Sequence, residues 1–289
     1  MQTLINPQTG HLAFKLYHFE GNNPFDHIQR LNYYSLIWIK KGAGKIKVDF
    51  SEYDFGPNAL VAFSPYQPFM ICGDDSLVAE VIHFHPDFFC IHKHQHEVAC
   101  NGVLFNNIYD SPLVQIDPNS ESVLNGIIPQ MKAEIQAAEL AHYEVLISYL
   151  KIFLVTASRL KNQQGEVKVK VTELGEEPRI VQRLKEAINE HFCVKHSARD
   201  YAELLAISPK ALNKITKGHF NKTLTNLIAE RIIIEAKREL YLSNKPVKEI
   251  AFRLGYEDEY YFSRFFKKHA DVSPQLYRET IGFNKASTV

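Results

Sequence analysis

The chain of 289 residues lacks the hallmarks of several protein classes. It has only four cysteines, which fits a reducing cytoplasm better than a disulfide framework. No apolar run is long enough to cross a bilayer, and the first residues (MQTLINPQTG) contain neither the basic stretch nor the apolar region of an export signal. Nucleophile elbows, phosphate-binding glycine loops and paired-carboxylate motifs are also missing. We therefore expect no catalytic activity, no cofactor and no membrane association.

The formal net charge of zero hides an asymmetry along the chain. Residues 1–175 contain 13 Lys and Arg against 18 Asp and Glu, whereas residues 176–289 contain 20 against 15. The length is sufficient for two domains, each with its own core. A basic C-terminal part favours a polyanion as partner for that part alone, although a solvated surface has the same charge excess.

Short β-strands separated by turns are predicted in the first hundred residues. β-Branched and aromatic residues fill 33–40 (YYSLIWIK), and residues 45–50 alternate polar and apolar side chains. Further short apolar runs, each bounded by Gly, Pro or Asp, lie at 59–63, 69–72 and 77–84. This spacing predicts an all-β barrel or jelly roll.

After about residue 118 the apolar period becomes that of helices. Residues 120–140 carry apolar side chains four apart (Val123, Ile127, Met131 and Ile135), and Pro129 is expected to kink or divide this helix. Residues 143–160 are apolar over much of the helix circumference, so this helix must be buried, and a second subunit could cover it. The polar segment 163–178 is predicted to be an interdomain linker.

Two short helices joined by a tight turn are predicted from Ser197 onward. Ser197, with Asp200 three residues later, can begin the first helix. Ser208 and Pro209 can cap and begin the second. The first helix has an apolar face of Tyr201, Leu204 and Leu205, and the second buries Leu212 and Ile215. Because the second helix is also basic, the pair is typical of a helix-turn-helix unit.

The same arrangement recurs fifty residues later. Pro246 can open a helix that Gly255 ends, and Asp258 can cap the next helix. Counted from the caps Ser208 and Asp258, matching residue types lie at positions four, six and seven: Leu212 with Phe262, Lys214 with Arg264, and Ile215 with Phe265. The repetition predicts two helix-turn-helix units.

Residues 225–242, between the two units, are predicted to form one long helix with an apolar face of Ile228, Ile232, Ala236 and Leu240. Eighteen residues span roughly 27 Å, and major grooves on one side of B-DNA recur about every 34 Å. The spacing is compatible with one chain that places both recognition helices in adjacent grooves.

Three segments carry a more specific pattern: 246–256 (PVKEIAFRLGY), 261–268 (YFSRFFKK) and 273–278 (SPQLYR). Together with Ala236 they closely resemble the AraC/XylS family. The first unit fits more loosely, and Thr216-Lys217 stands where the family has an aromatic and a basic residue. The resemblance implies a bacterial transcription regulator that binds double-stranded DNA as a homodimer, with RNA polymerase as a further candidate partner.

By this resemblance each recognition helix presents a few side chains to DNA. In the first unit these are Lys210, Asn213 and Lys214, and in the second they are Glu259, Tyr260 and Arg264. Arg can pair bidentately with guanine, Asn with adenine, and Glu can accept from cytosine. Phosphate contacts are expected from Lys217, Lys222, Lys267 and Lys268. The alternative for any one of these side chains is an exposed polar face. The predicted core residues are Leu212, Ile250, Ala251, Phe262 and Phe265.

Residues 44–49 (GKIKVD) and 62–68 (AFSPYQP) are similar to segments of the cupin-type sensing domain that precedes this DNA-binding region in many family members. The similarity implies a barrel that binds a small-molecule effector, followed by helices that mediate dimerisation. Candidate effector-binding residues are Trp38, Phe63, Phe69, Ile71 and His83. Their alternative role is to fill the barrel.

Histidine and cysteine are concentrated between residues 83 and 100: His83, His85, Cys90, His92, His94, His96 and Cys100. Imidazole and thiolate suit zinc or copper. A metal-dependent cupin enzyme, or a metal or thiol sensor, anchored to DNA is therefore the alternative function, with Cys90, His92, His96 and Cys100 as ligands. None of the spacings is a standard zinc pattern, so surface or core side chains without a metal remain the default prediction.

The sequence therefore predicts an α+β protein in three parts. A cupin-like β-barrel (jelly roll) with following helices occupies residues 1–162, a linker 163–178, and an all-α domain with two helix-turn-helix units joined by a long helix 179–289. We expect a cytoplasmic dimer in which effector occupancy changes how the DNA-binding units are presented. A regulator that responds to a protein partner, without a small molecule, is the remaining alternative.

Overall fold

The computed structural model describes residues 1–7, 10–49, 51–137, 140–172 and 176–281. The chain divides into two compact units. The N-terminal unit comprises Met1–Val48, Glu52–Asn107 and Pro112–Val167, and the C-terminal unit comprises Asp49–Ser51, Ile108–Ser111 and Lys168–Val289. Among the described residues, no helix has both the length and the apolar character needed to cross a membrane.

Two antiparallel sheets form the framework of the N-terminal unit. The larger has the strand order β1-β2-β8-β3-β6-β9. Its strands are β1 (Gln2–Ile5), β2 (Leu12–Glu20), β3 (Tyr34–Lys41), β6 (Ala59–Phe63), β8 (Val78–Phe84) and β9 (Leu113–Gln115). The smaller has the order β5-β4-β7 and consists of β4 (Gly44–Val48), β5 (Ser51–Phe55) and β7 (Phe69–Gly73). The five predicted strands are present with ends that differ from the prediction by at most two residues, whereas β1, β2, β5 and β9 were not predicted.

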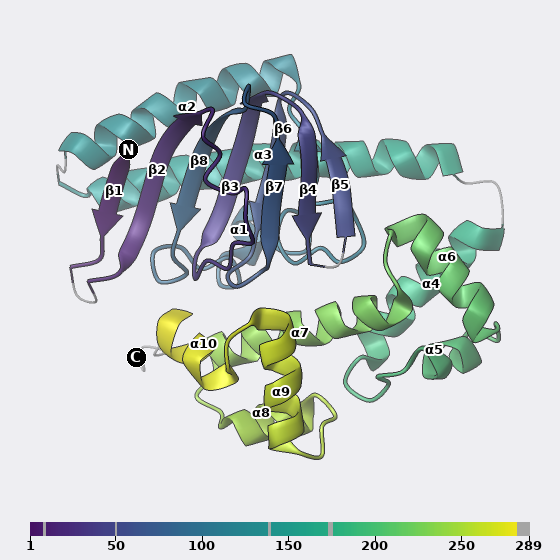
Figure 1. Ribbon diagram of the computed structural model, residues 1–289. Coiled ribbons are helices and arrows are strands. Elements are labelled where there is room, and N and C mark those ends of the chain that lie inside the picture. Colours follow the sequence, from purple (N-terminus) through teal and green to yellow (C-terminus); the bar gives the residue numbers. More distant parts are fainter. Residues whose placement is uncertain (8–9, 50, 138–139, 173–175, 282–289) are drawn as a thin grey trace. The chain divides into compact units, whose positions relative to one another are not determined.

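One apolar cluster lies between the larger sheet and the helices that follow it. Helices α2 (Pro118–Ala137) and α3 (His142–Thr172) run along one face of the sheet (Figure 1). The short helix α1 (Gln95–Val98) also contributes Val98 to this cluster. Helix α3 buries one apolar face within this unit, formed by Leu146, Leu150, Phe153, Leu154, Ala157 and Leu160. Pro129 lies inside α2 and does not divide it.

A second apolar cluster joins the two sheets. It combines Ile37 of β3 and Val81 of β8 in the larger sheet with Ile46 of β4 and Ile71 of β7 in the smaller one. Because strand side chains alternate between faces, β3 serves both clusters: Leu36 and Trp38 face the helices, and Ile37 and Ile39 face the smaller sheet.

The segment predicted as a linker is largely helical. Helix α3 continues to Thr172, and α4 (Glu176–His191) begins before residue 178. Polar composition does not distinguish a solvated helix from a linker, and a single interior glycine costs a helix only about 1 kcal/mol.

Helix α7 (Leu224–Leu242) connects the two halves of the C-terminal unit. Helices α4, α5 (Ala198–Leu204) and α6 (Pro209–Phe220) lie at one end of α7 (Figure 1). Helices α8 (Val247–Arg253), α9 (Glu259–Ala270) and α10 (Pro274–Ile281) lie at the other end. The expected apolar face of α7 is confirmed, because Ile228, Ile232, Ala236 and Leu240 are all buried.

Candidate nucleic-acid interface

The two helix pairs, α5–α6 and α8–α9, are built alike. The side chains of Ser208 and Asp258 cap the second helix of each pair by accepting hydrogen bonds from backbone N–H groups of the first turn. Both helices are 12 residues long. Each ends at a residue in the left-handed conformation, Asn221 with φ 56° and Asp271 with φ 64°. The hydrogen bonds accepted by Ser208 and Asp258 confirm these two residues as the predicted N-terminal caps.

The turns inside the two pairs also share a hydrogen-bond pattern. Ile207 N–H donates to the carbonyl of Ala202, and Tyr256 N–H donates to that of Ala251. Such a bond closes a helix when the residue before the donor is left-handed. Gly255 meets this need with φ 81°, as predicted, and Ala206 takes the same place in the first unit with φ 55°.

The buried face of each recognition helix differs from the prediction at one position. Side chains four, eight and twelve residues after the cap are buried: Leu212, Thr216 and Phe220 in α6, and Phe262, Phe266 and Ala270 in α9. Position seven, predicted to be core, is only half-buried in both units, at Ile215 and Phe265. A helix of 3.6 residues per turn places position eight nearer than position seven to the line through four and twelve.

The first recognition helix, α6, exposes three of the predicted basic side chains: Lys210, Lys214 and Lys217. Asn213 is half-buried, and its Oδ1 accepts a hydrogen bond from the backbone N–H of Leu224 at 3.4 Å. The Thr216 hydroxyl donates to the carbonyl oxygen of Asn213 at 3.1 Å. Asn213 thus helps to join α6 to α7, and the three lysines are the exposed side chains of this set.

The second recognition helix, α9, exposes Tyr260, Arg264, Lys267 and Lys268, whereas Glu259 is half-buried. Tyr261, which was not predicted, is 58% exposed, and the Arg264 guanidinium carbon lies 6.0 Å from the centre of its ring. Its spacing could have identified it: Tyr261 lies three residues after the Asp258 cap and almost one helical turn before Arg264, so the two side chains are neighbours on the helix surface. Tyr261 therefore belongs to the exposed set of α9.

Lys222 was predicted to contact phosphate, and the structure contradicts this. Its side chain is 7% exposed, and its Nζ lies 2.8 Å from Oε2 of Glu230 on α7. Glu230 is buried as well. Burial raises the pKa of the Glu230 carboxyl, and the ammonium group of Lys222 opposes that rise. Lys222 is an internal ion-pair partner, because a side chain so placed cannot reach a phosphate.

In the N-terminal unit the five candidate effector-binding residues do not all come together. Phe63 and Phe69 stack with ring centres 3.8 Å apart, in the cluster that also holds Ile71. His83 approaches this cluster through Phe25, with ring centres 6.3 Å apart. Trp38 lies on the opposite face of the larger sheet, among residues that pack against α2 and α3.

His83 is the centre of a buried polar group. It lies across from Ser35 on β3 and from Lys15 on β2. Its Nδ1 lies 2.9 Å from the Ser35 hydroxyl oxygen, and its Nε2 lies 3.3 Å from that of Tyr17. The Tyr33 ring is centred 4.6 Å from the His83 ring. Burial lowers the pKa of His83 to about 3 and raises the pKa of Tyr17 and Tyr33, so at neutral pH the imidazole is uncharged and the phenols are protonated.

The histidine- and cysteine-rich segment shows no metal-binding arrangement in the part of the chain that the structure describes. No three His, Cys, Asp or Glu side chains there are placed to hold one ion. Cys100 is fully buried among apolar residues, and burial raises the pKa of its thiol to about 12. Such a thiol is protonated at neutral pH, whereas metals bind the thiolate. His94 stacks on Phe89 and its Nδ1 lies 2.8 Å from Glu97 Oε1.

Two similarly capped recognition helices with exposed basic faces, joined by a long buried helix, define a tandem helix-turn-helix protein. Residues 201–280 match the family described as "Helix-turn-helix domain". The chain is 32% identical over 95 residues to the raffinose operon transcriptional regulatory protein RafR of Pediococcus pentosaceus, and covers 34% of that protein's length. It is 30% identical over 102 residues to the regulatory protein SoxS of Salmonella typhimurium, and covers 95% of SoxS.

The chain belongs to the AraC/XylS family of transcription regulators, since the match to SoxS extends over nearly the whole of that protein. The match to RafR covers 33% of this chain. Among solved structures, ToxT from Vibrio cholerae is similar with a TM-score of 0.40 and 16% identity, over 93% of this chain and 98% of ToxT.

Proposed function

We propose that this protein is a sequence-specific regulator of transcription that reads duplex DNA with helices α6 and α9. The observation that carries the proposal is the repeated construction of the two units, with basic side chains extending from equivalent exposed faces. Helices of this kind enter the major groove and contact base edges with three or four side chains.

The exposed side chains divide into two groups by chemistry. Arg264 is suited to bidentate contact with guanine, the ring of Tyr261 lies beside it, and Tyr260 is also exposed on α9. Lys210, Lys214, Lys217, Lys267 and Lys268 supply positive charge that neutralises phosphates and orients the protein on the duplex. Asn213 contributes to base contact less than predicted, because its side-chain oxygen is engaged inside the domain.

The proposal is tested by binding of the full chain to genomic DNA fragments at several salt concentrations. Arg264→Ala should weaken binding to a preferred fragment by roughly 10- to 100-fold with little change for other fragments, because one bidentate base contact contributes about 1–3 kcal/mol. Lys267→Ala should weaken binding to all fragments and lower the salt slope by about one. Arg159→Ala, an exposed position of α3, is the control. Equal affinity of the parent protein for every fragment would contradict the proposal.

The N-terminal unit is proposed to be a cupin-like sensing domain that binds a small molecule between its two sheets. Phe63, Phe69 and Ile71 supply an apolar lining. Two protonated phenols, on Tyr17 and Tyr33, supply hydrogen-bond donors, and the ammonium of Lys15, 4.7 Å from the Tyr17 ring centre, supplies charge. Donors and a cation beside apolar side chains suit a mainly apolar effector with an anionic or acceptor group.

A metabolite screen by thermal denaturation tests this assignment. A binding effector should raise the melting temperature of the parent protein, and Tyr33→Phe should reduce that rise, because it removes one donor while it retains the ring. Trp38→Phe, on the other face of the sheet, is the matched control and should keep the response. If both variants respond as the parent does, the effector binds elsewhere.

The proposed regulator is a cytoplasmic homodimer without catalytic activity, with RNA polymerase as its partner at the promoter. The buried helices α2 and α3 restrict a dimer contact to their exposed positions, such as Val123 and Ile152, which are 49% and 48% exposed. Sedimentation of the parent protein and of Ile152→Lys would test this: a monomer in both cases would remove the dimer from the proposal.

A further inference from the structure

Direct contacts between the two helix-turn-helix units supplement the connection through α7. The segment 192–197, which leads from α4 into α5 of the first unit, lies against the turn of the second unit. A Cβ atom at Gly255 would overlap the carbonyl oxygen of Cys193 and lie 3.1 Å from Cε1 of His196. The rings of His196 and Tyr256 are centred 4.9 Å apart. Glycine is thus required at 255 for two reasons: the left-handed backbone and the close approach of the first unit.

Charged side chains of α7 hold the same two units. The Arg231 guanidinium carbon lies 3.9 Å from the centre of the Phe192 ring, just after α4. Eight residues further along α7, Glu239 Oε2 accepts from Arg253 of α8 at 2.9 Å. Glu235 lies between them and pairs with Arg231 at 3.1 Å and with Arg238 at 2.7 Å.

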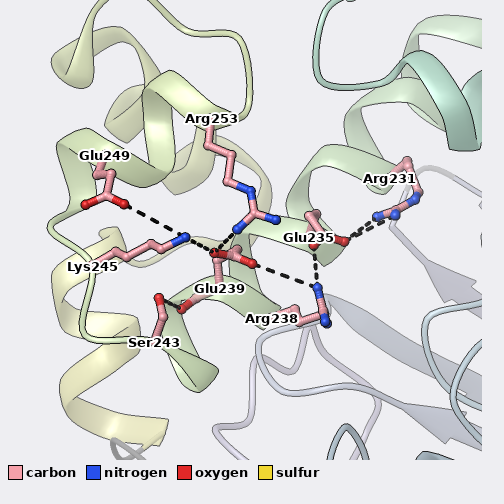
Figure 2. A network of polar contacts seen from close by, with 8 residues as sticks. All are labelled: Arg231, Glu235, Arg238, Glu239, Ser243, Lys245, Glu249 and Arg253. Atoms are coloured by element: carbon pink, nitrogen blue, oxygen red, sulfur yellow. Dashed lines mark hydrogen bonds and ion pairs between the residues drawn. The ribbon is translucent and has the colours of Figure 1, made fainter.

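Figure 2 shows this network as one continuous series of contacts, to which Lys245 and Glu249 are joined. The side chains of Glu235 and Glu239 are only 14% and 10% exposed. Solvent and salt weaken ion pairs of such shielded carboxylates less than they weaken exposed pairs. Loss of one partner therefore leaves the charge of the other partner uncompensated. Burial raises the pKa of the Cys193 thiol, and the nearby charges of Glu235, Arg231, Arg253 and Glu239 also act on it, so the thiol lies beside the network.

We propose that this junction, formed by residues 192–197, the α7 network and the 255–256 turn, holds the two recognition helices at one separation and rotation. Glu239, His196 and Gly255 are its positioning residues: they touch no DNA and act through the placement of α6 and α9. The protein therefore accepts a single spacing between the two DNA segments that it reads. The inference rests on the proposed DNA-binding function.

The physical reason is geometric. One inserted base pair turns the second segment by about 34–36° and moves it by about 3.4 Å. A single long helix could bend or twist at its end to follow such a change, but a second set of contacts between the same two units opposes this. The misfit then appears as lost affinity.

The test begins by selecting a preferred sequence for the full chain from a random duplex library. One, two or three base pairs are then inserted between the two DNA segments that the protein reads. The parent protein should lose at least about tenfold in affinity per inserted base pair. Glu239→Gln and His196→Ala should bind the original spacing within about threefold of the parent protein and lose only about threefold on insertion. Glu203→Gln, which removes an equal charge from an exposed pair of α5, should behave as the parent protein does.

Three outcomes would overturn the inference. If the parent protein tolerates insertions, its two helix-turn-helix units are not held at one spacing. If the junction variants keep the full insertion penalty, the substituted residues have no positioning role. Failure to select any preferred sequence would remove the proposed DNA-reading function, and this inference with it. Circular dichroism of each variant before binding establishes that a changed penalty does not reflect unfolding. Gly255→Ala is used only as a further variant, because its backbone strain could unfold the turn.

Discussion

Replacement of Phe266 by alanine is expected to lower the free energy of unfolding of the C-terminal unit by about 3–5 kcal/mol, the range for loss of a buried phenylalanine. Phe266 is fully buried, and its ring centre lies 6.1 Å from that of Phe262 and 5.6 Å from that of Tyr277 on α10. The side chain therefore joins α9 to α10, and its removal leaves a cavity between them. A loss of this size is a large part of the total stability of a small domain.

Phe265→Ala is the matched control, because it makes the same chemical change one residue away. Phe265 is half-buried and packs on Tyr256 and His269, with ring centres 5.3 Å and 4.7 Å away. We expect it to cost less than half as much. The single tryptophan, Trp38, lies in the N-terminal unit, so its fluorescence follows that unit while circular dichroism at 222 nm follows the helices. Equal losses for the two alanine variants would contradict the assignment of the core.

The difference between Phe265 and Phe266 shows how far the sequence could predict the recognition helices. Both caps and the core position four residues after each cap followed from Ser208, Asp258, Leu212 and Phe262. The next core position did not, because α9 offers two adjacent phenylalanines and α6 offers Ile215 beside Thr216. Hydrophobicity alone favours Ile215, whereas helix geometry and a hydroxyl bonded within its own helix bury Thr216 instead.

The N-terminal unit was predictable in part for a similar reason. Apolar runs bounded by turn residues located five strands, yet the face on which each side chain lies depends on strand register. The sequence prediction places Trp38 with Phe63 and His83 among the candidate effector-binding residues, whereas the structure places Trp38 and Phe63 in different apolar clusters. Its neighbours Ile37 and Ile39 face the smaller sheet, so alternation along β3 places Trp38 on the helix side. Strand β2 carries a detectable alternation at Phe14, Lys15 and Leu16, whereas β9 is three residues long and exists through its pairing with β6.

Lys222→Met is expected to destabilise the C-terminal unit by about 3 kcal/mol at pH 7, because it leaves the Glu230 carboxyl buried without its cation. The carboxyl can then remain in the fold only by taking up a proton. Since its ordinary pKa is 4.5, that proton costs about 1.4 kcal/mol for each pH unit above this value. Glu230 in this variant is an acid whose pKa is higher in the folded than in the unfolded state, so stability should fall as pH rises above about 4.5. Denaturation at pH 5 and pH 7 should show a larger loss at pH 7.

Lys217→Met distinguishes this role from a phosphate contact, because Lys217 is exposed on α6 and only five residues away. It should leave the free energy of unfolding almost unchanged while it lowers the salt slope of DNA binding by about one. Lys222→Met should do the reverse when assayed well below its melting temperature. The double variant Lys222→Met/Glu230→Met should recover most of the lost stability, since it removes the uncompensated carboxyl as well as the amine. If Lys222→Met keeps full stability but lowers the salt slope, then Lys222 is a phosphate contact, and the ion pair with Glu230 does not stabilise the fold.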